Sequence, residues 1–598
     1  MNNPTPPIEP LLQLAKSGRM PLDALINHAE AFKAAGRPVD ALNLYKIWIA
    51  CTPSDAKFVA FFNWGVLLAD QNDLESAELA YRQALKLKPS LHQARINLGL
   101  ALERKGQSRD ALQLWAEVED SKDAASAEIR CVALNSIGRL QEQLKQYDAA
   151  EAALTHSLAI NPNQPDALQH WVHLRQKQCK WPVYSPLPGL TENAMLAATS
   201  PLAMLSQHDD PALQWHVANS FNQRKFNLQT QNLAGAARYG HQRIRLGYLS
   251  GDLCTQAVGL LMADLMEAHD KTQFEVFAFD FSPTDGTAYQ HRLRSAFEHV
   301  ISIKNLSDAQ AAKLILDNEI DVLIDLHGLS SGARPGILAQ RPAPLQVTYL
   351  GFIGTTAMPW IDYVISDAYA LPNALQPYFT EKVIEVPSPF IPLHGESIPK
   401  SKQTRKTLGL PSDAIVLACF NNIYKINPEI FASWMKVLKR NASCVLWLLD
   451  DNPWATAQLQ QRAKEAGAPL SRIVFAPRCT YAEYRSRLTL ADLYLDTYPY
   501  NAGSTARDVF DARLPMVTLS GKTFVSRMAG SMLHAAGLDE LCTSSHAEYE
   551  RAINQLVRQP AQLKGLKKHL QQASSEWSEC PKRLIASLEA SFKRLLSH

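Results

Sequence analysis

Small and hydroxyl-bearing residues fill a short segment near residue 500, between a strand-like run and a helical pattern. The segment reads NAGST over residues 501–505, after an expected strand at 491–495 and before an expected helix at 505–514. Glycine and alanine let an anion approach the backbone closely, and Ser504 and Thr505 add hydroxyl donors at the helix start. Free N–H groups and the positive end of the helix dipole favour negative charge at the same place. These residues indicate a phosphate-binding turn, although an ordinary N-cap uses similar residue types.

The composition limits the classes of protein to which this chain can belong. Its 598 residues predict two to four domains, and 46% hydrophobic residues can supply their cores. A net charge of +2, with 20% charged residues, argues against a dedicated nucleic-acid binder and against a disordered chain.

The expected compartment follows from the cysteines and the N-terminus. Nine cysteines are scattered without a CxxC pair, which is typical of reduced thiols and not of a disulfide framework or a zinc site. The first residues lack the basic and apolar regions of a secretory signal. No apolar run approaches the roughly 18 residues of a membrane helix. We therefore expect a cytoplasmic protein without a membrane span.

An internal repeat runs through the N-terminal third of the chain. Gly65 recurs as Gly99 and Ala77 recurs as Ala111, each 34 residues later, while a third copy is delayed by extra residues near 121–123. This spacing resembles the tetratricopeptide repeat, a helix-turn-helix unit in which small residues lie where paired helices touch and a large aromatic fills the gap between repeats. We expect about four units over roughly residues 20–165.

Arrays of this kind expose a concave groove that holds an extended peptide or a partner protein. A structural spacer or an oligomerisation surface is the alternative.

From residue 243 the pattern changes to alternating strands and helices, which predicts parallel sheets covered on both faces. The expected strands are 244–250, 274–279, 300–302 and 321–326 in a first half, and 414–420, 444–449, 472–475, 493–495 and 515–519 in a second. Two Rossmann-like lobes would place a ligand at the carboxyl ends of their strands. No GxGxxG motif follows a strand, which argues against a dinucleotide oxidoreductase.

These patterns give an expected domain order. We expect a repeat array at 1–165, a helical connector at 166–240, an acceptor-side lobe at 241–398, a donor-site lobe at 399–560, and C-terminal helices at 561–598 that pack back on the lobes.

Several motifs then follow one another in a characteristic order. They are RLGYLSGD at 245–252, RPAPLQV at 341–347, GFIGT at 351–355, FNNIYKI at 420–426, VLWLL at 445–449, the segment 495–508 and SRMAGS at 526–531. Preceded by the repeats, they resemble the O-GlcNAc transferase and SPINDLY family of protein glycosyltransferases, most closely its bacterial members. The resemblance implies a helical tetratricopeptide superhelix followed by an α/β GT-B fold of two Rossmann-like lobes. It also implies inverting, metal-independent sugar transfer, and the second half indeed lacks a DxD motif.

The resemblance assigns a donor site in the second lobe. A departing nucleoside diphosphate gathers negative charge that lysine, backbone N–H groups and hydroxyls must meet when no metal is present. Lys425 takes the position of the family's essential phosphate-binding lysine, and Asp508 that of its ribose-binding aspartate. A surface lysine and a first-turn acid that complements the helix dipole are the alternatives. The expected donor-binding residues are Asn422, Lys425, Asn501, Gly503, Ser504, Thr505 and Asp508.

The first lobe supplies the expected acceptor side and the candidate catalytic groups. In the family, a glycine-rich loop lies near the sugar and the acceptor. The alternative is that these prolines and glycines only form turns between structural elements. The loop residues here are Pro344, Gln346, Gly351, Gly354 and Thr355. The candidate catalytic residues, besides Lys425, are Asp252, Gln256 and His327. His327 could position the sugar or shuttle a proton, and a satisfied structural histidine is the alternative.

The chain departs from the family pattern at four positions that usually carry histidine. They are Gln256, Leu260, Tyr484 and Gly503. Glutamine forms hydrogen bonds but cannot act as a general base. The sequence therefore does not identify the general base, and Asp252, His327 and the donor phosphate itself are the candidates.

The leading interpretation is a protein O-glycosyltransferase with UDP-GlcNAc as the default donor and no cofactor or metal. GDP-fucose, used by SPINDLY-type relatives, is an alternative donor. The expected partner is a protein or peptide acceptor such as flagellin, and the chain could form a homo-oligomer. A non-catalytic repeat scaffold and a nucleotide-sugar epimerase are the other interpretations. The repeat array argues against the epimerase, because a small-molecule enzyme needs no peptide groove.

Overall fold

The computed structural model describes residues 7–119, 126–226, 232–396 and 398–597. The chain divides into two compact units, the first comprising Met1–Leu174 and Pro186–Thr191, and the second Arg175–Ser185 and Glu192–His598. The connector expected at 166–240 is thus shared between the two units. The extra residues expected near 121–123 lie outside the described part of the chain.

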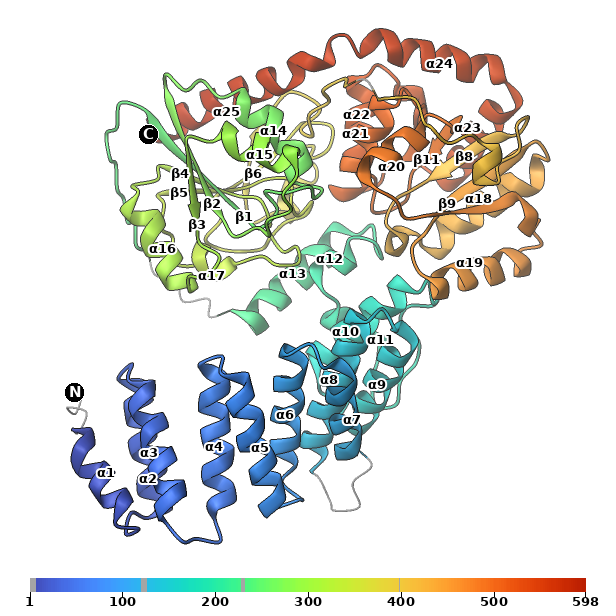
Figure 1. The fold of residues 1–598 in the computed structure, drawn as a ribbon. Coiled ribbons are helices and arrows are strands. Elements are labelled where there is room, and N and C mark those ends of the chain that lie inside the picture. Colours follow the sequence, from blue (N-terminus) through green and yellow to red (C-terminus); the bar gives the residue numbers. More distant parts are fainter. Residues whose placement is uncertain (1–6, 120–125, 227–231, 397, 598) are drawn as a thin grey trace. The chain divides into compact units, whose positions relative to one another are not determined.

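The first unit is a row of consecutive helices, coloured blue to cyan in Figure 1. Glycine lets the two helices of a repeat approach closely, because Gly65 on α4 faces Tyr81 on α5 and Gly99 on α6 faces Trp115 on α7. Each aromatic therefore packs within its own repeat, and the Tyr81 side chain also makes a hydrogen bond with Asn97 on α6 of the next repeat. The helices are α1 (Ile8–Lys16), α2 (Leu22–Ala34), α3 (Pro38–Cys51), α4 (Lys57–Asp70), α5 (Leu74–Leu87), α6 (His92–Arg104), α7 (Ser108–Glu119), α8 (Ala127–Gln143), α9 (Tyr147–Ile160) and α10 (Pro165–Lys177).

Replacing Gly99 with alanine is expected to destabilise the repeat array. A Cβ at this position would lie 2.3 Å from Nε1 of the buried Trp115, so the helices must move apart. Such overpacking costs about 1–3 kcal/mol, against a gain of about 1 kcal/mol in helix propensity. Hydrogen exchange in the full chain should show lower protection of residues 92–119. Gly565→Ala is the matched control, because this glycine in α24 has no atom within 4 Å of its added Cβ.

The first lobe of the second unit is a seven-stranded parallel sheet in the order β3-β2-β1-β4-β5-β6-β7. Its strands are β1 (Ile244–Ser250), β2 (Phe274–Asp280), β3 (His299–Ser302), β4 (Val322–Asp325), β5 (Leu345–Thr348), β6 (Tyr363–Ser366) and β7 (Lys382–Glu385). The first four confirm the expected strands. The last three, β5, β6 and β7, were not expected from the sequence.

The second lobe is a six-stranded parallel sheet in the order β10-β9-β8-β11-β12-β13. Its strands are β8 (Ile415–Cys419), β9 (Cys444–Asp450), β10 (Ile473–Pro477), β11 (Leu493–Leu495), β12 (Met516–Leu519) and β13 (Cys542–Thr543). Strand order reverses between β8 and β11, as it does between β1 and β4 in the first lobe. Ligands of open parallel sheets bind beside such reversals, at the carboxyl ends of the strands.

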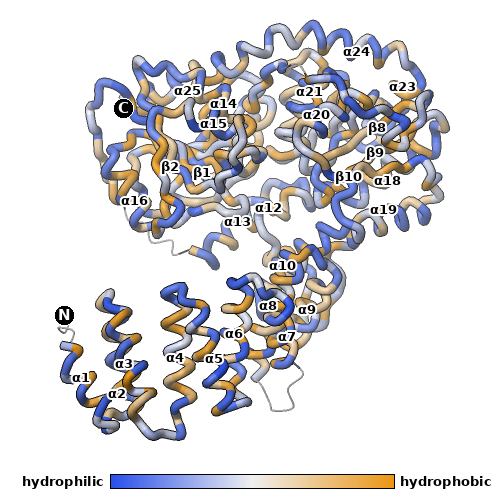
Figure 2. Tube along the Cα trace, viewed as in Figure 1, coloured by the Kyte–Doolittle hydropathy of each residue, from blue (hydrophilic) through white to orange (hydrophobic). Residues whose placement is uncertain are grey.

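Helices cover both sheets, and the strands appear mostly orange among helices of mixed colour in Figure 2. In the first lobe, Figure 1 shows α14 and α15 on one side of the sheet and α16 and α17 on the other. The helices of the second unit are α11 (Glu192–Ala198), α12 (Pro201–Met204), α13 (Pro211–Lys225), α14 (Gly259–Glu267), α15 (Ala288–Ala296), α16 (Asp308–Asp317), α17 (Pro335–Leu338), α18 (Pro428–Arg440), α19 (Pro453–Glu465), α20 (Tyr481–Leu488), α21 (Ser504–Asp511), α22 (Met528–Ala535), α23 (His546–Arg558), α24 (Pro560–Ala573) and α25 (Cys580–Leu596).

The C-terminal helix returns to the first lobe, where α25 packs against α14. Buried His269 accepts or donates hydrogen bonds on both sides, at 2.8 Å from the Tyr248 hydroxyl and 2.8 Å from the Glu589 carboxylate of α25. Among the described residues, no helix combines the length and apolar character that a bilayer-spanning segment requires.

Candidate active site

A cavity of ≈ 360 Å³ opens at the carboxyl ends of β8, β9 and β10 in the second lobe. One side belongs to the first lobe, where Ala257 and Leu260 stand at the start of α14. The other side carries Asp508 and the two residues expected to bind phosphate through their hydroxyls, Ser504 and Thr505. The lining residues are Ala257, Leu260, Phe420, Leu449, Ala476, Pro477, Arg478, Cys479, Tyr481, Tyr484, Arg487, Ser504, Thr505 and Asp508.

The turn that joins β11 to α21, residues 496–503, is held by a buried carboxylate. Asp496 is fully buried and accepts hydrogen bonds from the backbone N–H groups of Thr497 and Ala502, each at 2.8 Å. Its other oxygen accepts from the Thr518 hydroxyl at 2.7 Å. Sequence reasoning missed Asp496, although its place directly after a buried strand was a usable signal. We call residues 496–503 the 496–503 turn.

The turn presents helix α21 to the cavity. Gly503 is the N-cap residue, and no side chain caps the helix. The first N–H groups of α21 are therefore open to an anion, as the sequence predicted. Half-buried Ser504 and Thr505 line the cavity beside them.

Lys425 lies against the same turn. It ends a short helical turn, Ile423–Lys425, that follows β8. Its Nζ donates a hydrogen bond to the backbone carbonyl of Asn501 at 3.1 Å and lies 3.7 Å from the centroid of the Tyr500 ring. Lys425 and the start of α21 are thus brought together, which supports the family assignment over a surface lysine.

Two asparagines precede this lysine, and the buried one reaches the turn. Asn421 donates to the Thr497 hydroxyl at 2.7 Å and to the Asp496 carboxylate at 3.1 Å. Asn422, the residue expected to contact the donor, is exposed and starts the helical turn. Its donor contact stays a prediction, while Asn421 is an anchor that sequence reasoning missed.

Burial governs the charges at this turn. It lowers the pKa of Lys425 to about 8, although the nearby Asp496 carboxylate acts in the opposite direction. Burial also raises the pKa of Asp496 to about 6, an effect that the Thr518 hydroxyl, the Ala502 N–H group and Lys425 reduce. A bound phosphate would stabilise the ammonium form of Lys425.

Binding of pyrophosphate at this cavity is expected to weaken as the pH rises through about 8. Below that pH Lys425 is already an ammonium group; above it, binding must first add a proton, so affinity falls by up to about tenfold per pH unit. Calorimetry between pH 6.5 and 9.5, repeated in buffers of different ionisation enthalpy, would measure both the affinity and the proton uptake. Lys425→Ala should bind weakly at every pH without this decline. A wild-type affinity that stays constant across the range would contradict the assignment.

Asp508 lies one turn into α21, where it is buried and lines the cavity. The Tyr481 hydroxyl donates a hydrogen bond to its Oδ1 at 2.7 Å, and Nε of Arg485 lies 3.6 Å from the same atom. Burial raises its pKa to about 6, while Arg507, Tyr481 and Arg485 lower it. Asp508 therefore has several charged and polar partners in the protein. Tyr481 was missed by sequence reasoning, and its ring stacks near that of Tyr484 at 6.1 Å.

The five residues expected to form one acceptor loop lie in two different places in the structure. Gln346 lies inside β5, fully buried, and its amide donates to the carbonyls of Leu338 at 2.9 Å and Trp360 at 2.8 Å. Pro344 directly precedes that strand, at the end opposite to its carboxyl end. The expectation that these two residues shape a loop near the sugar is wrong, because Gln346 lies inside the sheet and Pro344 precedes β5 at the end opposite to its carboxyl end.

The other three loop residues do follow the carboxyl end of β5. A Cβ on Gly351 would lie 2.0 Å from the Leu326 carbonyl oxygen, so only glycine fits there. Gly354 is buried, and the hydroxyl of Thr355 donates to the buried Glu381 carboxylate at 2.7 Å. Thr355 therefore fixes the loop, and a contact with the acceptor stays a prediction.

His327 is a satisfied buried histidine. Its Nε2 accepts a hydrogen bond from the Gly251 N–H group at 2.8 Å, and its Nδ1 lies 3.0 Å from the Ser330 hydroxyl. With both ring nitrogens engaged, the structural alternative is favoured over a proton shuttle. Asp252 is half-buried, and Gln256 is exposed beside the cavity residue Ala257. Their catalytic roles stay predictions.

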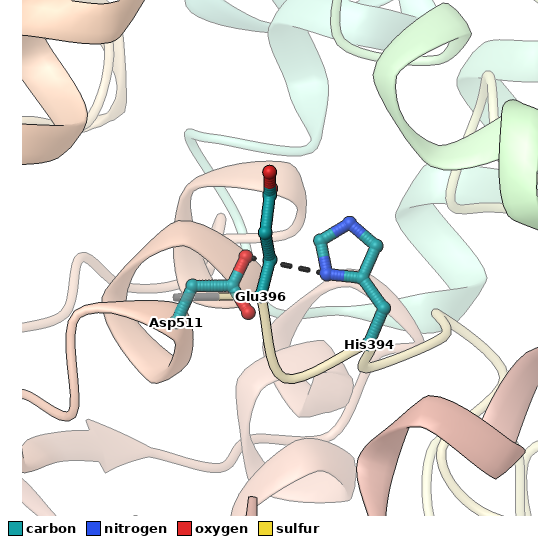
Figure 3. A group of neighbouring side chains, drawn as sticks. All are labelled: His394, Glu396 and Asp511. Atoms are coloured by element: carbon teal, nitrogen blue, oxygen red, sulfur yellow. Dashed lines mark ion pairs between the residues drawn. The ribbon is translucent and has the colours of Figure 1, made fainter. Parts of the chain in front are cut away.

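Within the described part of the chain, one histidine-carboxylate group has a spacing that could hold a metal. The ligand atoms of His394, Glu396 and Asp511 all lie within 4.8 Å of one another (Figure 3). Arg485, however, pairs with Glu396 at 2.7 Å and with Asp511 at 3.1 Å. This guanidinium already neutralises both carboxylates, so the group forms a salt-bridge network beside α21.

The family profile that matches this chain is that of glycosyl transferase family 41, over residues 221–395 and 392–580. The chain belongs to glycosyl transferase family 41. The tetratricopeptide repeat profile matches residues 59–91 and 132–164 of the same chain. The resemblance stated from the sequence motifs is thereby confirmed.

Curated relatives support the same membership. Over 367 residues this family 41 chain is 33% identical to the probable UDP-N-acetylglucosamine–peptide N-acetylglucosaminyltransferase SEC of Arabidopsis thaliana, covering 60% of the chain and 37% of that protein. Over 421 residues it is 28% identical to the UDP-N-acetylglucosamine–peptide N-acetylglucosaminyltransferase of Caenorhabditis elegans, covering 52% and 37%. The chain spans little more than a third of the length of these relatives.

The fold of the family 41 chain is similar to that of a solved O-GlcNAc transferase from Thermobaculum terrenum. The two structures superpose with a TM-score of 0.63 at 24% identity, covering 96% of this chain and 97% of the other. Repeats followed by two Rossmann-like lobes of GT-B type, as expected from the sequence, are therefore confirmed.

Proposed function

We propose that this family 41 chain is a protein O-glycosyltransferase that moves a sugar from a nucleoside diphosphate donor to a serine or threonine hydroxyl. The observation that carries the proposal is the contact between Lys425 and the 496–503 turn. This contact brings an ammonium group to the turn that leads into α21, a helix with open N–H groups whose first residues, Ser504 and Thr505, line the cavity. A diphosphate leaving group needs this set of donors.

The proposed reaction is a direct displacement that inverts the anomeric carbon. The acceptor hydroxyl attacks this carbon from the face opposite to the diphosphate, and a new C–O bond forms. The bond to the phosphate oxygen breaks, and its electron pair stays on the diphosphate, where Lys425 and α21 stabilise the added charge. The hydroxyl proton passes to a base, for which Asp252 and the donor phosphate are our candidates. In this scheme no metal or cofactor takes part.

UDP-GlcNAc is the proposed donor, because the Arabidopsis thaliana and Caenorhabditis elegans relatives are named for UDP-N-acetylglucosamine. GDP-fucose is the alternative. We propose that the repeats hold a protein acceptor, with flagellin as one example, and that the protein acts in the cytoplasm. The nine cysteines, all within the described residues, are free thiols, in keeping with a reducing compartment.

A non-catalytic scaffold is the second candidate, and a specific observation favours it. Gln256 and Gly503 stand where the family has histidine, and both ring nitrogens of His327 are engaged in the fold. Retained Lys425, Ser504, Thr505 and Asp508 oppose it.

Calorimetric titration of the purified protein with UDP, UDP-GlcNAc and GDP-fucose would test the donor proposal. We expect one nucleotide family to bind, which would name the donor. Mass spectrometry of proteins from cells with and without the gene should then reveal a hexosamine or deoxyhexose difference on serine or threonine. Nucleotide binding without any such difference would favour the scaffold, and binding of none of the three would refute the donor site.

A further inference from the structure

A carboxylate from the helical connector reaches into the second lobe. Asp209 lies in the loop between α12 and α13, and its Oδ2 accepts from the Tyr498 hydroxyl at 2.8 Å and the Lys522 N–H group at 2.6 Å. Its Oδ1 accepts from the hydroxyls of Thr523 and Ser526, each at 2.7 Å. Four donors thus converge on one side chain, and the proposed function gives it no role.

These four donors come from two separate segments of the second lobe. Tyr498 belongs to the 496–503 turn, and the other three belong to residues 520–527, which follow β12. The two segments meet at Asn501, whose N–H group lies 3.4 Å from the Val525 carbonyl. The carbonyl of the same Asn501 receives the hydrogen bond from Lys425. Asp209 therefore joins the two segments at the place where Lys425 is held.

The loop after β12 is shaped to admit this carboxylate. A Cβ on Gly521 would lie 2.3 Å from Oδ2 of Asp209, so any larger residue would push the carboxylate out. The same connector also contacts the first lobe, where Asn222 of α13 donates to the Thr356 carbonyl at 2.8 Å. It thus makes hydrogen bonds to both lobes, close to the loop after β5 on one side and to the 496–503 turn on the other.

We propose that Asp209 is a positioning residue for the donor phosphate site, a role that rests on the proposed function. Asp209 does not line the cavity. It holds Tyr498 and thereby fixes the 496–503 turn. This turn places the Asn501 carbonyl, which accepts the hydrogen bond from Lys425. A carboxylate suits this task, because hydrogen bonds to a charged acceptor are about twice as strong as neutral ones. Without it, the turn and Lys425 would sample more than one arrangement.

Asp209→Asn and Tyr498→Phe test the proposal by removing several hydrogen bonds and a single hydrogen bond, respectively. The asparagine keeps the shape of the side chain but cannot accept from all four donors, whereas the phenylalanine removes a single hydroxyl. Asp210→Asn is the matched control, because Asp210 caps α13 through the N–H groups of Ala212 and Leu213 and asparagine caps equally well. All three variants make a conservative change, and the first and third remove the same charge.

We expect Asp209→Asn to weaken UDP binding by about tenfold, Tyr498→Phe by less, and Asp210→Asn not at all. In a Lys425→Ala background, Asp209→Asn should weaken binding no further, because the positioned group is gone. Hydrogen exchange of residues 496–505 in the unliganded protein should rise in Asp209→Asn and stay unchanged in Asp210→Asn.

Each result decides for or against the positioning role. A lower unfolding temperature in Asp209→Asn, with unchanged UDP affinity and unchanged exchange at 496–505, would overturn it and leave a merely structural contact. Additive losses in the Lys425→Ala background would overturn it as well. If the wild type binds no nucleotide, the proposed function fails, and the exchange measurement still decides whether Asp209 fixes the turn.

Discussion

Lys425→Ala is expected to weaken nucleoside diphosphate binding by about 100-fold, which corresponds to about 3 kcal/mol. Hydrogen bonds to charged groups contribute up to about 3 kcal/mol each, and this lysine is the ammonium group held against the 496–503 turn, which leads into α21. The loss should appear in the affinity for the nucleotide alone as well as for the nucleotide sugar, because the lost contact is to phosphate. Calorimetric titration with UDP measures it directly.

Lys406→Ala is a suitable control, because Lys406 is an exposed lysine of the same lobe in a different segment, the short helical turn Lys406–Leu408. Thermal unfolding of both variants would separate a binding defect from a folding defect. Burial lowers the pKa of Lys425, so its charge is less favourable in the folded protein than in the unfolded chain. We therefore expect no large loss of stability. Equal UDP affinities of Lys425→Ala and the wild type would place the phosphate elsewhere.

How much of this site could be predicted depends on the sequence distance of the contacts. Ser504, Thr505 and Gly503 form one local segment, so their residue types alone predicted a helix start open to an anion. Lys425 was placed at the same site by a motif. Its carbonyl partner on Asn501 lies 76 residues away, and neither periodicity nor composition predicts such a contact.

The wrong assignments have physical causes of the same kind. Gln346 was read as part of a glycine-rich loop, because β5 is a four-residue strand whose polar side chain is satisfied inside the core. His327 has the residue type of a proton shuttle, yet two contacts that only the folded chain provides engage its ring nitrogens. Asp209 gave no signal, because its four donors lie about 300 residues further along the chain.

Asp496→Ala is expected to destabilise the second lobe by about 4 kcal/mol, because it removes an acceptor and leaves several buried donors unpaired. Those donors are the N–H groups of Thr497 and Ala502, the Thr518 hydroxyl and the Asn421 amide. Urea unfolding, followed by hydrogen exchange of peptides from residues 399–560, would measure the loss. Asp413→Ala, at an exposed position of the same lobe, should change little. An unchanged urea midpoint for Asp496→Ala would contradict the anchoring role.

Asp496→Asn separates the anchoring role from the electrostatic one. Its remaining oxygen can accept from the two N–H groups, and its amide nitrogen can donate to the Thr518 hydroxyl, so the turn should keep its shape. The negative charge that raises the pKa of Lys425 is lost, however, so that pKa should fall below about 8. We therefore expect pyrophosphate affinity to start declining at a lower pH than in the wild type. A decline at the same pH as in the wild type would mean that Asp496 does not act on the charge of Lys425, whereas a shift to lower pH would identify it as the residue that keeps this lysine charged at neutral pH.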